Sequence, residues 1–300
     1  MEKRRLGISD LYVSEIGLGC MSLPTDHLEA NKIIKAALDN GITYFDTADL
    51  YNNGENEQMI GNALKDKRQE VILATKVGNR MNESGEGWFW DPSKKWITSA
   101  IHKSLKRLQT DYIDVYQLHG GTVEDDLDEV IDTMESLKKD GLIREYGISS
   151  IRPTVIDYFL QNSNAVSVMM QYSLLDRRPE EWFSILEKHN VSLLSRGTLA
   201  KGLLTENGRN RVNKTNEYLS YSQIELLATL EQLQKLDAPI TSVALQYVLK
   251  RSVTGSLILG ASSTEQLLES IHAYSIKVPR DILLKAEEIT KKEIYKEHRV

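Results

Sequence analysis

Residues 112–149 read YIDVYQLHGGTVEDDLDEVIDTMESLKKDGLIREYGIS, and this stretch contains the pattern that decides the fold. It opens with a run of apolar, β-branched and aromatic residues at 112–119, which is typical of a strand. In 128–141 the apolar residues recur at spacings of three and four, and the segment ends in Lys-Lys-Asp-Gly, as many helices do. A second strand follows at 144–149. The stretch therefore predicts one strand–helix–strand unit.

The same alternation recurs about eight times along the chain. The expected strands are 14–20, 42–47, 71–76, 112–119, 144–149, 165–171, 191–197 and 256–261. Amphipathic segments lie between them, such as 93–108, for which Ser93 is the expected N-cap. Strands alternating with helices in this way indicate parallel βαβ units.

Eight such units in 300 residues predict a (β/α)8 TIM barrel that occupies residues 1–300 as a single domain. A doubly wound open sheet is the alternative, but GLGCM at 17–21 lacks the GxGxxG fingerprint that often opens one. No Pro-, Gly- or Ser-rich linker divides the chain. The first dozen residues, with a turn around Gly7 to Asp10, predict a short N-terminal β-hairpin before the barrel.

The composition favours a protein that handles small molecules. A formal net charge of −6 argues against nucleic acid as a general partner, and no apolar run approaches the roughly 20 residues that a membrane helix needs. The first residues lack the apolar core of a secretory signal, and the single cysteine cannot form an internal disulfide. We therefore expect a cytoplasmic protein with no membrane association and no obligate protein partner.

Polar side chains stand where several of these apolar strands end. In a barrel of this kind, catalytic groups come from the carboxyl ends of the strands and the loops after them. Asp46 and Lys76 end neighbouring strands, His119 ends the fourth, and Tyr51 follows Asp46 by five residues. The other five histidines fall in helices, at helix starts or in the tail, where structural or solvated roles are expected: His27, His102, His189, His272 and His298.

These four residue types suit acid–base chemistry. An ammonium at the end of an apolar strand is costly unless a carboxylate accompanies it, and Asp46 is the nearest candidate for Lys76. An ammonium beside the Tyr51 phenol would favour the phenolate and so make proton donation feasible, while His119 could hydrogen-bond a carbonyl oxygen. Four unrelated residues on the barrel rim are the equally weighted alternative. Asp49 is expected to support the loop.

The chain resembles an aldo-keto reductase from end to end. The matching motifs are LGISDLYVSEIGLGCM, GITYFDTADLYNNGENEQMIG, VILATKVG, DYIDVYQLH, LKKDGLIREYGISS and LILGASSTEQL, in that order. The resemblance implies that Tyr51 is the general acid for carbonyl reduction, that Lys76 and Asp46 tune its acidity, and that His119 orients the substrate. For Glu57, a favourable charge at the start of the next helix is as well supported as any role in the site.

The resemblance also implies a nicotinamide dinucleotide bound across the barrel mouth without a Rossmann unit. Ser149 and Gln171 would contact the carboxamide, and Cys20 would pack near the cofactor. The implied cofactor-binding residues are Gly19, Cys20, Met21, Asp46, Ser149, Gln171, Arg196, Gly197, Leu199, Gly202, Leu203, Gly260, Ser262 and Gln266. No metal site is expected.

Two positions depart from the family pattern. Arg196 stands where relatives usually carry an aromatic residue; its guanidinium could stack on the nicotinamide or pair with phosphate, or it could be an ordinary rim residue. The segment expected at the adenosine 2′ end, 260–270, carries Ser262 and Gln266 but no positive charge. We expect NADP(H) to be the cofactor, because the family commonly uses it, with weak discrimination against NAD(H).

The loop after the third strand, 78–92, carries the substrate prediction. Trp88 and Trp90 stand there in a glycine-rich context and could wall an apolar carbonyl pocket, or could pack on the barrel rim. The expected function is reduction of an aldehyde or ketone. Dehydrogenation of a polyol or sugar alcohol, and a nucleotide-sensing regulatory subunit of the same fold, are the alternatives.

Overall fold

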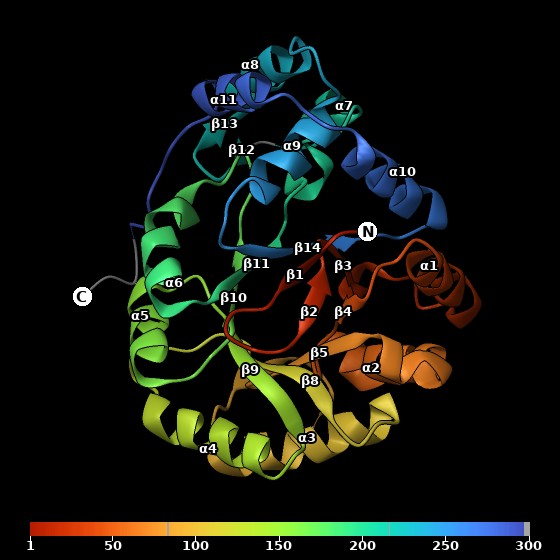
Figure 1. The fold of residues 1–300 in the computed structure, drawn as a ribbon, viewed down its shortest axis with the longest axis vertical. Helices are drawn as coiled ribbons and strands as arrows, with labels where there is room; N and C mark the ends of the chain where they lie inside the picture. Colours follow the sequence, from red (N-terminus) through yellow and green to blue (C-terminus); the bar gives the residue numbers. More distant parts are fainter. Residues whose placement is uncertain (83, 216, 297–300) are drawn as a thin grey trace.

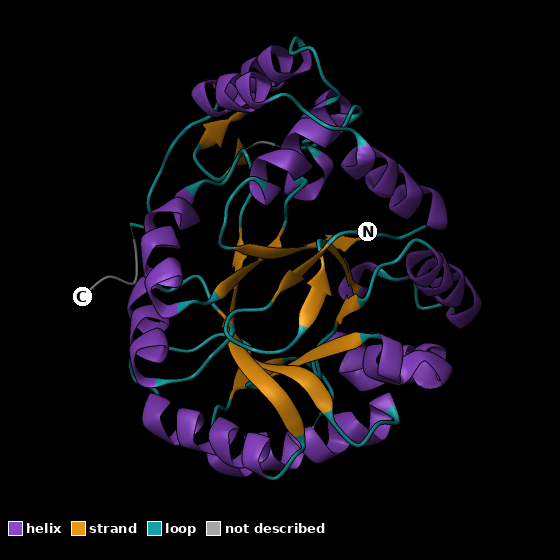
Figure 2. Ribbon diagram, viewed as in Figure 1, coloured by secondary structure: helices purple, strands orange, loops and turns teal. Residues whose placement is uncertain are grey.

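Eight parallel strands close into a barrel in the computed structural model, which describes residues 1–82, 84–215 and 217–296 (Figures 1 and 2). His298 lies outside the described residues. Around the barrel the order is β10, β11, β14, β3, β4, β5, β8 and β9. The strands are β3 (Ile16–Gly19), β4 (Tyr44–Asp46), β5 (Ile72–Val77), β8 (Ile113–Leu118), β9 (Ile143–Ser149), β10 (Ser167–Gln171), β11 (Ser192–Arg196) and β14 (Thr254–Gly260). The predicted (β/α)8 fold is confirmed, and each predicted strand end lies within two residues of the observed one.

Helices form a ring outside the strands (Figure 2). They are α1 (His27–Asp39), α2 (Glu55–Leu64), α3 (Lys94–Leu108), α4 (Leu127–Lys139), α5 (Pro153–Asn162), α6 (Phe183–His189), α7 (Gly208–Val212), α8 (Gln223–Gln234), α9 (Ile240–Leu249), α10 (Thr264–Ser275) and α11 (Arg280–Ile289). Short 3-10 helices are η1 (Cys20–Ser22), η2 (Tyr51–Gly54), η3 (Lys65–Glu70), η4 (Arg178–Trp182) and η5 (Ala200–Gly202). Ser93 caps α3 as expected, because its hydroxyl accepts from the Trp96 amide at 3.2 Å.

The N-terminal hairpin, β1 (Lys3–Arg5) and β2 (Tyr12–Ser14), closes one end of the barrel (Figure 1). The Gly7 amide donates to the Ser192 hydroxyl at 2.8 Å, and the Arg4 guanidinium donates to the Thr254 carbonyl at 2.9 Å. Because Ser192 and Thr254 begin their strands, the hairpin is fixed to the amino-terminal end of the barrel. The opposite end carries the loops expected to hold the site.

Two of those loops contain more structure than the sequence predicted. The segment after β5 forms a hairpin of β6 (Asn79–Met81) and β7 (Trp88–Trp90), although 78–92 reads as an open, glycine-rich loop. The polar segment after β11 contains α7 and a second hairpin, β12 (Glu217–Tyr218) with β13 (Tyr221–Ser222). Both hairpins are short and turn-rich, so their period-two pattern is too brief to read.

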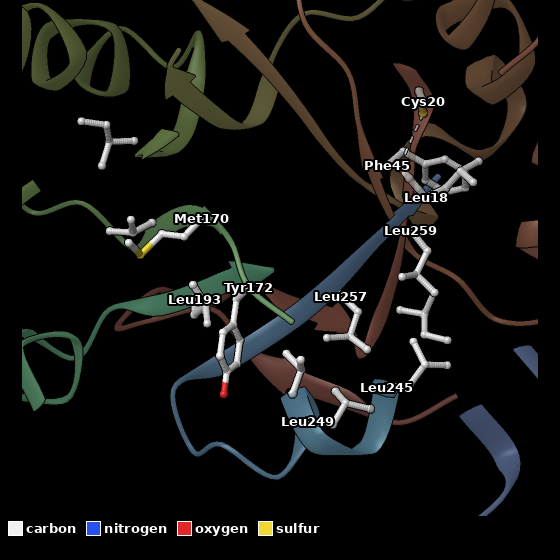
Figure 3. Close-up of a cluster of buried hydrophobic side chains, with 14 of the residues drawn as sticks. Leu18, Cys20, Phe45, Met170, Tyr172, Leu193, Leu245, Leu249, Leu257 and Leu259 are labelled. Carbon is white, nitrogen blue, oxygen red and sulfur yellow. Dashed lines mark hydrogen bonds between the residues drawn. The ribbon is translucent and has the colours of Figure 1, made fainter. Parts of the chain in front are cut away.

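The barrel separates two hydrophobic cores. The inner one fills the barrel and includes Leu6 of the hairpin together with inward residues such as Tyr44, Val115 and Met169. The outer one lies between the strands and the helices; Figure 3 shows Leu257 and Leu259 of β14 near Leu245 and Leu249 of α9. Alternate residues of each strand serve the two cores because strand side chains alternate between faces.

The same alternation places one further inward position on every strand, at its carboxyl end. These positions lie two residues beyond the inner core and form the last layer before the mouth. They are Gly19, Asp46, Lys76, Gln117, Ser149, Gln171, Arg196 and Gly260. The strand register supports the layer, since Gly260 pairs with Gly19, Gly19 with Asp46, and Gln171 with Arg196.

No helix among the described residues is both long enough and apolar enough to span a membrane. The longest of them, α3, has 15 residues and a strongly charged outer face.

Close packing between α2 and α3 generates a stability prediction. A Cβ added to Gly61 would lie 2.6 Å from the backbone of Arg107 and Leu108, so the two helices can approach only because residue 61 has no side chain. Gly61→Ala should lower the free energy of unfolding by about 1–2 kcal/mol, since overpacking outweighs the helix propensity gained. Urea denaturation measures this. Gln58→Ala, exposed on the same helix, should stay within about 0.5 kcal/mol of the parent.

Candidate active site

A buried ion pair stands at the carboxyl ends of β4 and β5. Lys76 is 1% exposed and Asp46 is 4% exposed, and the Lys76 ammonium donates to Asp46 Oδ1 at 2.5 Å. The ammonium also donates to the Thr47 carbonyl at 2.7 Å, while the Gln117 amide donates to Asp46 Oδ2 at 3.0 Å. Both charges thus have the partners that burial requires. The pair predicted from the strand ends is present.

The Lys76 side chain keeps its positive charge. Burial alone would lower its pKa, but the charges of Asp46 and Tyr51 and hydrogen bonds to both outweigh that effect and raise the pKa above its usual value. A fixed ammonium therefore stands beside the Tyr51 phenol throughout the pH range in which most proteins are folded.

Tyr51 reaches the ion pair from the loop that follows β4. Its hydroxyl lies 3.3 Å from Lys76 Nζ, and the side chain is half-buried. The chain turns away directly after it through Asn52, Asn53 and Gly54, which have φ values of 49°, 55° and 90°. Asparagine and glycine are the residues that tolerate this left-handed region. The Asn-Asn-Gly run therefore directs the tyrosine into the mouth while α2 starts behind it.

His119 lies beside the phenol as well. The two rings meet edge to face, with centroids 6.1 Å apart. Burial, followed by the positive charges of Lys76 and Arg196, lowers the pKa of His119 to about 3. The imidazole is therefore neutral near pH 7 and carries one N–H. Its Nδ1 has no hydrogen-bond partner within the described part of the chain.

Glu57 holds the tyrosine loop from behind. It stands in the first turn of α2, as expected, but it is fully buried and accepts hydrogen bonds from Thr75 Oγ1 at 2.6 Å and Arg107 Nε at 2.6 Å. The Arg107 side chain also packs on Gly54, where an added Cβ would lie 2.7 Å from Arg107 Cδ. Glu57 thus ties the Tyr51 loop to the strand that carries Lys76.

Asp49 is a second buried carboxyl in this region. It is 9% exposed, and its Oδ1 finds no hydrogen-bond donor among the residues that the structure describes. Burial, and next the neighbouring Glu57 carboxylate, raise the pKa of Asp49 to about 8, although Arg107 and Lys76 act in the opposite direction. Asp49 therefore has an unusual affinity for a proton, and its role as a loop support stays a prediction.

The residues expected at the nicotinamide end converge on the far side of the mouth. Arg196 is exposed, and its guanidinium donates to Gln171 Oε1 at 3.2 Å. Ser149 and Gln171 end β9 and β10 and are partly exposed. After Arg196 the chain turns through Gly197 and Gly202, which have φ values of 67° and 83°. Leu199 beside them is half-buried and Leu203 is buried.

Gly19 and Gly260 form a stretch without side chains between the Asp46–Lys76 ion pair and the group around Arg196. They are adjacent in the β3–β14 register, and neither carries a side chain that would fill the mouth. Cys20 follows and is fully buried, and burial raises the pKa of its thiol far above the usual range, so it stays protonated. The Asn56 amide donates to the Cys20 carbonyl at 2.9 Å, and Met21 is 67% exposed.

Ser262 and Gln266 lie next to this stretch, at the start of α10. Both are exposed, and the Ser262 amide donates to Gln266 Oε1 at 2.8 Å. Ser263 caps the helix by accepting from the Gln266 amide. The first turn of α10 contains Glu265 and no basic residue, so the absence of positive charge predicted for this segment is confirmed.

The two tryptophans of the β6–β7 hairpin have different environments. Trp88 is 55% exposed, whereas Trp90 is half-buried and donates its indole N–H to Asp125 at 2.9 Å. The Trp90 ring covers Gly78 and Gly120. A Cβ added to Gly78 would lie 2.4 Å from the ring, and a Cβ added to Gly120 would lie 3.2 Å from it. Trp90 is therefore a fixed wall beside His119, and Trp88 is the freer of the two.

Sequence reasoning missed three residues that support the ion pair and the tyrosine loop. Gln117 is the last inward residue of β8, but an amide before the His119 motif gave no separate signal. Asn56 links Thr47 Oγ1, at 2.6 Å, to the Cys20 carbonyl. Arg107 belongs to a helix face that reads as solvated, and only the contact with Glu57 across 50 residues reveals its role.

Fold and site together define a barrel protein with a cluster of ionisable residues at the carboxyl ends of its strands. A family model described as "Aldo/keto reductase family" matches residues 15–291. The chain belongs to the aldo/keto reductase family, and its relatives include oxidoreductases.

Three relatives show the extent of the similarity. The chain is 51% identical to the "Uncharacterized oxidoreductase YqkF" of Bacillus subtilis (strain 168), covering 100% of both chains. Among solved structures it resembles aldo-keto reductase AKR11C1 from Bacillus halodurans in its holo form, with a TM-score of 0.96, 50% identity and full coverage of both chains. It also resembles the glycerol dehydrogenase AKR11B4 from Gluconobacter oxydans, with a TM-score of 0.83 and 25% identity over 96% of this chain and 94% of that one.

The buried carboxyl of Asp49 generates a prediction about pH. With its pKa raised to about 8, the folded chain keeps a proton that the unfolded chain loses near pH 4, so stability falls as pH rises between these values. Asp49→Asn removes this dependence. Its gain in free energy of unfolding over the parent should grow with pH, by at most about 1.4 kcal/mol per unit, and level off above pH 8.

Urea titrations at pH 5, 7 and 9 measure the difference. Asp66→Asn on the exposed η3 removes the same formal charge from the surface and controls for net charge. A difference between Asp49→Asn and the parent that stays constant from pH 5 to pH 9 would contradict the assignment.

Proposed function

We propose that the chain is an NADP(H)-dependent carbonyl reductase that converts an aldehyde or ketone to the alcohol, with Tyr51 as proton donor. One observation carries the proposal: a buried, ion-paired ammonium lies 3.3 Å from a tyrosine hydroxyl at the barrel mouth, beside a neutral imidazole. This arrangement supports proton transfer to a carbonyl oxygen.

Each residue of the group has a separate task in this proposal. Tyr51 gives its proton to the carbonyl oxygen, and the Lys76 ammonium stabilises the phenolate that remains. Asp46 keeps Lys76 charged and oriented. Neutral His119 donates its single N–H to the same carbonyl oxygen and so orients the substrate.

The residues at the mouth fit a nicotinamide cofactor. When bound, the dihydronicotinamide supplies a hydride to the carbonyl carbon. Gly19 and Gly260 leave a bare surface between two polar groups, and an added Cβ at residue 260 would lie 2.3 Å from Ser22 Oγ. Gln171 and Ser149 offer hydrogen-bonding groups for the carboxamide. The exposed Arg196 guanidinium offers a planar cation for stacking or for a phosphate.

Preference for NADP(H) over NAD(H) is the weaker part of the proposal. The start of α10 offers backbone amides and two neutral side chains, Ser262 and Gln266, which suit either a phosphate or a ribose hydroxyl. Without a basic residue in that turn, we expect tighter binding of NADP(H) by only a modest factor.

A polyol or sugar-alcohol dehydrogenase is the second candidate, since the same four residues act in either direction. The similarity to a protein described as a glycerol dehydrogenase favours keeping it. A nucleotide-sensing regulatory subunit is the third, and the complete set of Asp46, Tyr51, Lys76 and His119 favours an enzyme over it. We place the protein in the cytoplasm, acting on a small carbonyl compound.

The deciding experiment combines binding and turnover. Titration with NADPH and NADH is followed by protein fluorescence, and aldehydes, ketones and polyols are then added in both redox directions. Tight binding with carbonyl-dependent oxidation of NADPH supports the reductase. Turnover with polyols alone would favour the dehydrogenase, and binding without any turnover would favour the sensor.

Replacing Tyr51 tests the proton donor. Tyr51→Phe should reduce kcat by at least about 100-fold, because no other phenol adjoins Lys76 within the described residues, while the Kd for NADPH changes less than about threefold. Stopped-flow turnover and fluorescence titration measure the two effects. Tyr158→Phe, exposed on α5, is the matched control and should leave both values unchanged. If Tyr51→Phe weakened binding and retained turnover, another residue would be the donor.

Replacing Arg196 tests the cofactor side. Arg196→Ala should raise the Kd for NADPH by about five- to 30-fold, as expected for loss of a cation that stacks on a ring or pairs with a phosphate. Arg5→Ala removes the same charge from the closed end of the barrel and should leave the Kd unchanged. An unchanged Kd in Arg196→Ala would make Arg196 an ordinary rim residue.

A further inference from the structure

The side-chain amide of Gln171 is held between two charges of opposite sign. Its Nε2 donates to Asp176 Oδ2 at 2.9 Å, and its Oε1 accepts from the Arg196 guanidinium at 3.2 Å. The Tyr218 hydroxyl lies 3.5 Å from the same Nε2. Gln171 is the last inward residue of β10, so its amide faces the barrel mouth.

These charges leave the amide one orientation. A carboxylate can only accept hydrogen bonds and a guanidinium can only donate them. Turning the Gln171 amide by half a turn would place its oxygen against Asp176 and its N–H groups against Arg196, losing both bonds. With one N–H on Asp176 and Tyr218 beside the amide nitrogen, the side available to a ligand is Oε1. That oxygen has two lone pairs, and Arg196 uses one.

Asp176 is itself fixed more firmly than Gln171. It is 2% exposed, and Arg178 binds both of its carboxylate oxygens at 2.7 Å and 2.8 Å. Its backbone exchanges two hydrogen bonds with Ser173, each of 3.1 Å. The Arg178 guanidinium lies 4.7 Å from the centre of the Tyr295 ring, which belongs to the C-terminal segment. An anchored carboxylate therefore orients a partly exposed amide.

We propose that Asp176 is a positioning residue for the cofactor: it turns Gln171 Oε1 towards the mouth, so that the site accepts a hydrogen bond from the carboxamide NH2 of the nicotinamide. The proposal rests on the proposed function, and it adds a residue that touches neither cofactor nor substrate. It explains why a buried charge stands five residues after the end of β10, where a neutral residue would fold at lower cost.

A ligand analogue separates this role from a merely structural one. In the 3-acetylpyridine analogue of NADPH, a methyl group replaces the carboxamide NH2, so the ligand cannot donate to Gln171 Oε1. The wild-type protein should bind NADPH about five- to tenfold more tightly than the analogue, which is the affinity expected from one additional hydrogen bond. In Asp176→Asn the neighbour can donate as well as accept, the Gln171 amide can turn, and the preference should fall to about twofold or less.

Asp114→Asn is the matched control. Asp114 is also a fully buried aspartate that pairs with arginines, Arg68 at 2.8 Å and Arg144 at 3.3 Å, but it has no contact with Gln171. Both variants are expected to lose stability, and only Asp176→Asn should lose the preference for NADPH. Gln171→Met should abolish the preference too, and adding Asp176→Asn to it should change nothing further.

The outcomes separate the inference from the proposed function. Absence of any binding of NADPH by the wild type would overturn the proposed function and the inference with it. Binding with equal affinity for NADPH and the analogue, or an Asp176→Asn variant that keeps the full preference, would overturn the inference while the reductase stands.

A measurement on the wild-type chain covers the case in which Asp176→Asn does not fold. The side-chain NH2 signal of Gln171, assigned by its loss in Gln171→Met, should show hydrogen exchange slowed at least tenfold relative to exposed glutamines, with and without NADPH. Exchange as fast as that of exposed glutamines would overturn the inference.

Discussion

The buried charge of Lys76 is the constraint on which the site depends. An ammonium removed from water must be fully partnered, and here a carboxylate and a backbone carbonyl accept hydrogen bonds from it. Asp46 is held in turn by Gln117, and the loop that brings Tyr51 is tied by Glu57 to the neighbouring residue Thr75. The contacts of Asp46 thus keep one positive charge stable at the bottom of the mouth, and Glu57 holds the tyrosine loop beside it.

The fold and much of this site followed from a simple periodicity. Strand-like runs separated by amphipathic helices predicted the barrel, and polar residues at the ends of apolar strands marked the mouth. Seven of the eight positions in the last inward layer were candidates, because the family resemblance or an isolated charge pointed to them. Gln117 escaped notice because it is uncharged and lies two residues before His119, whose imidazole was the signal at that strand end.

Other features could not be predicted because they depend on contacts between distant parts of the chain. Arg107 meets Glu57 across 50 residues, and the charge pattern of α3 gave no reason to choose this arginine over its neighbours. The hold of Asp176 on Gln171 is local in sequence, but it requires the turn between Ser173 and Asp176. The hairpins after β5 and β11 are short, and turn residues hide their pattern.

The N-terminal hairpin determines from which end of the barrel a molecule can enter. Leu6, Leu11 and Val13 fill the amino-terminal end of the barrel interior, and inner-core side chains block the path from there to Lys76. The mouth is thus the one approach to the ion pair along the barrel axis. A molecule that reaches the ion pair along this axis must therefore enter and leave by the same opening, and the hairpin keeps the amino-terminal end shut to it.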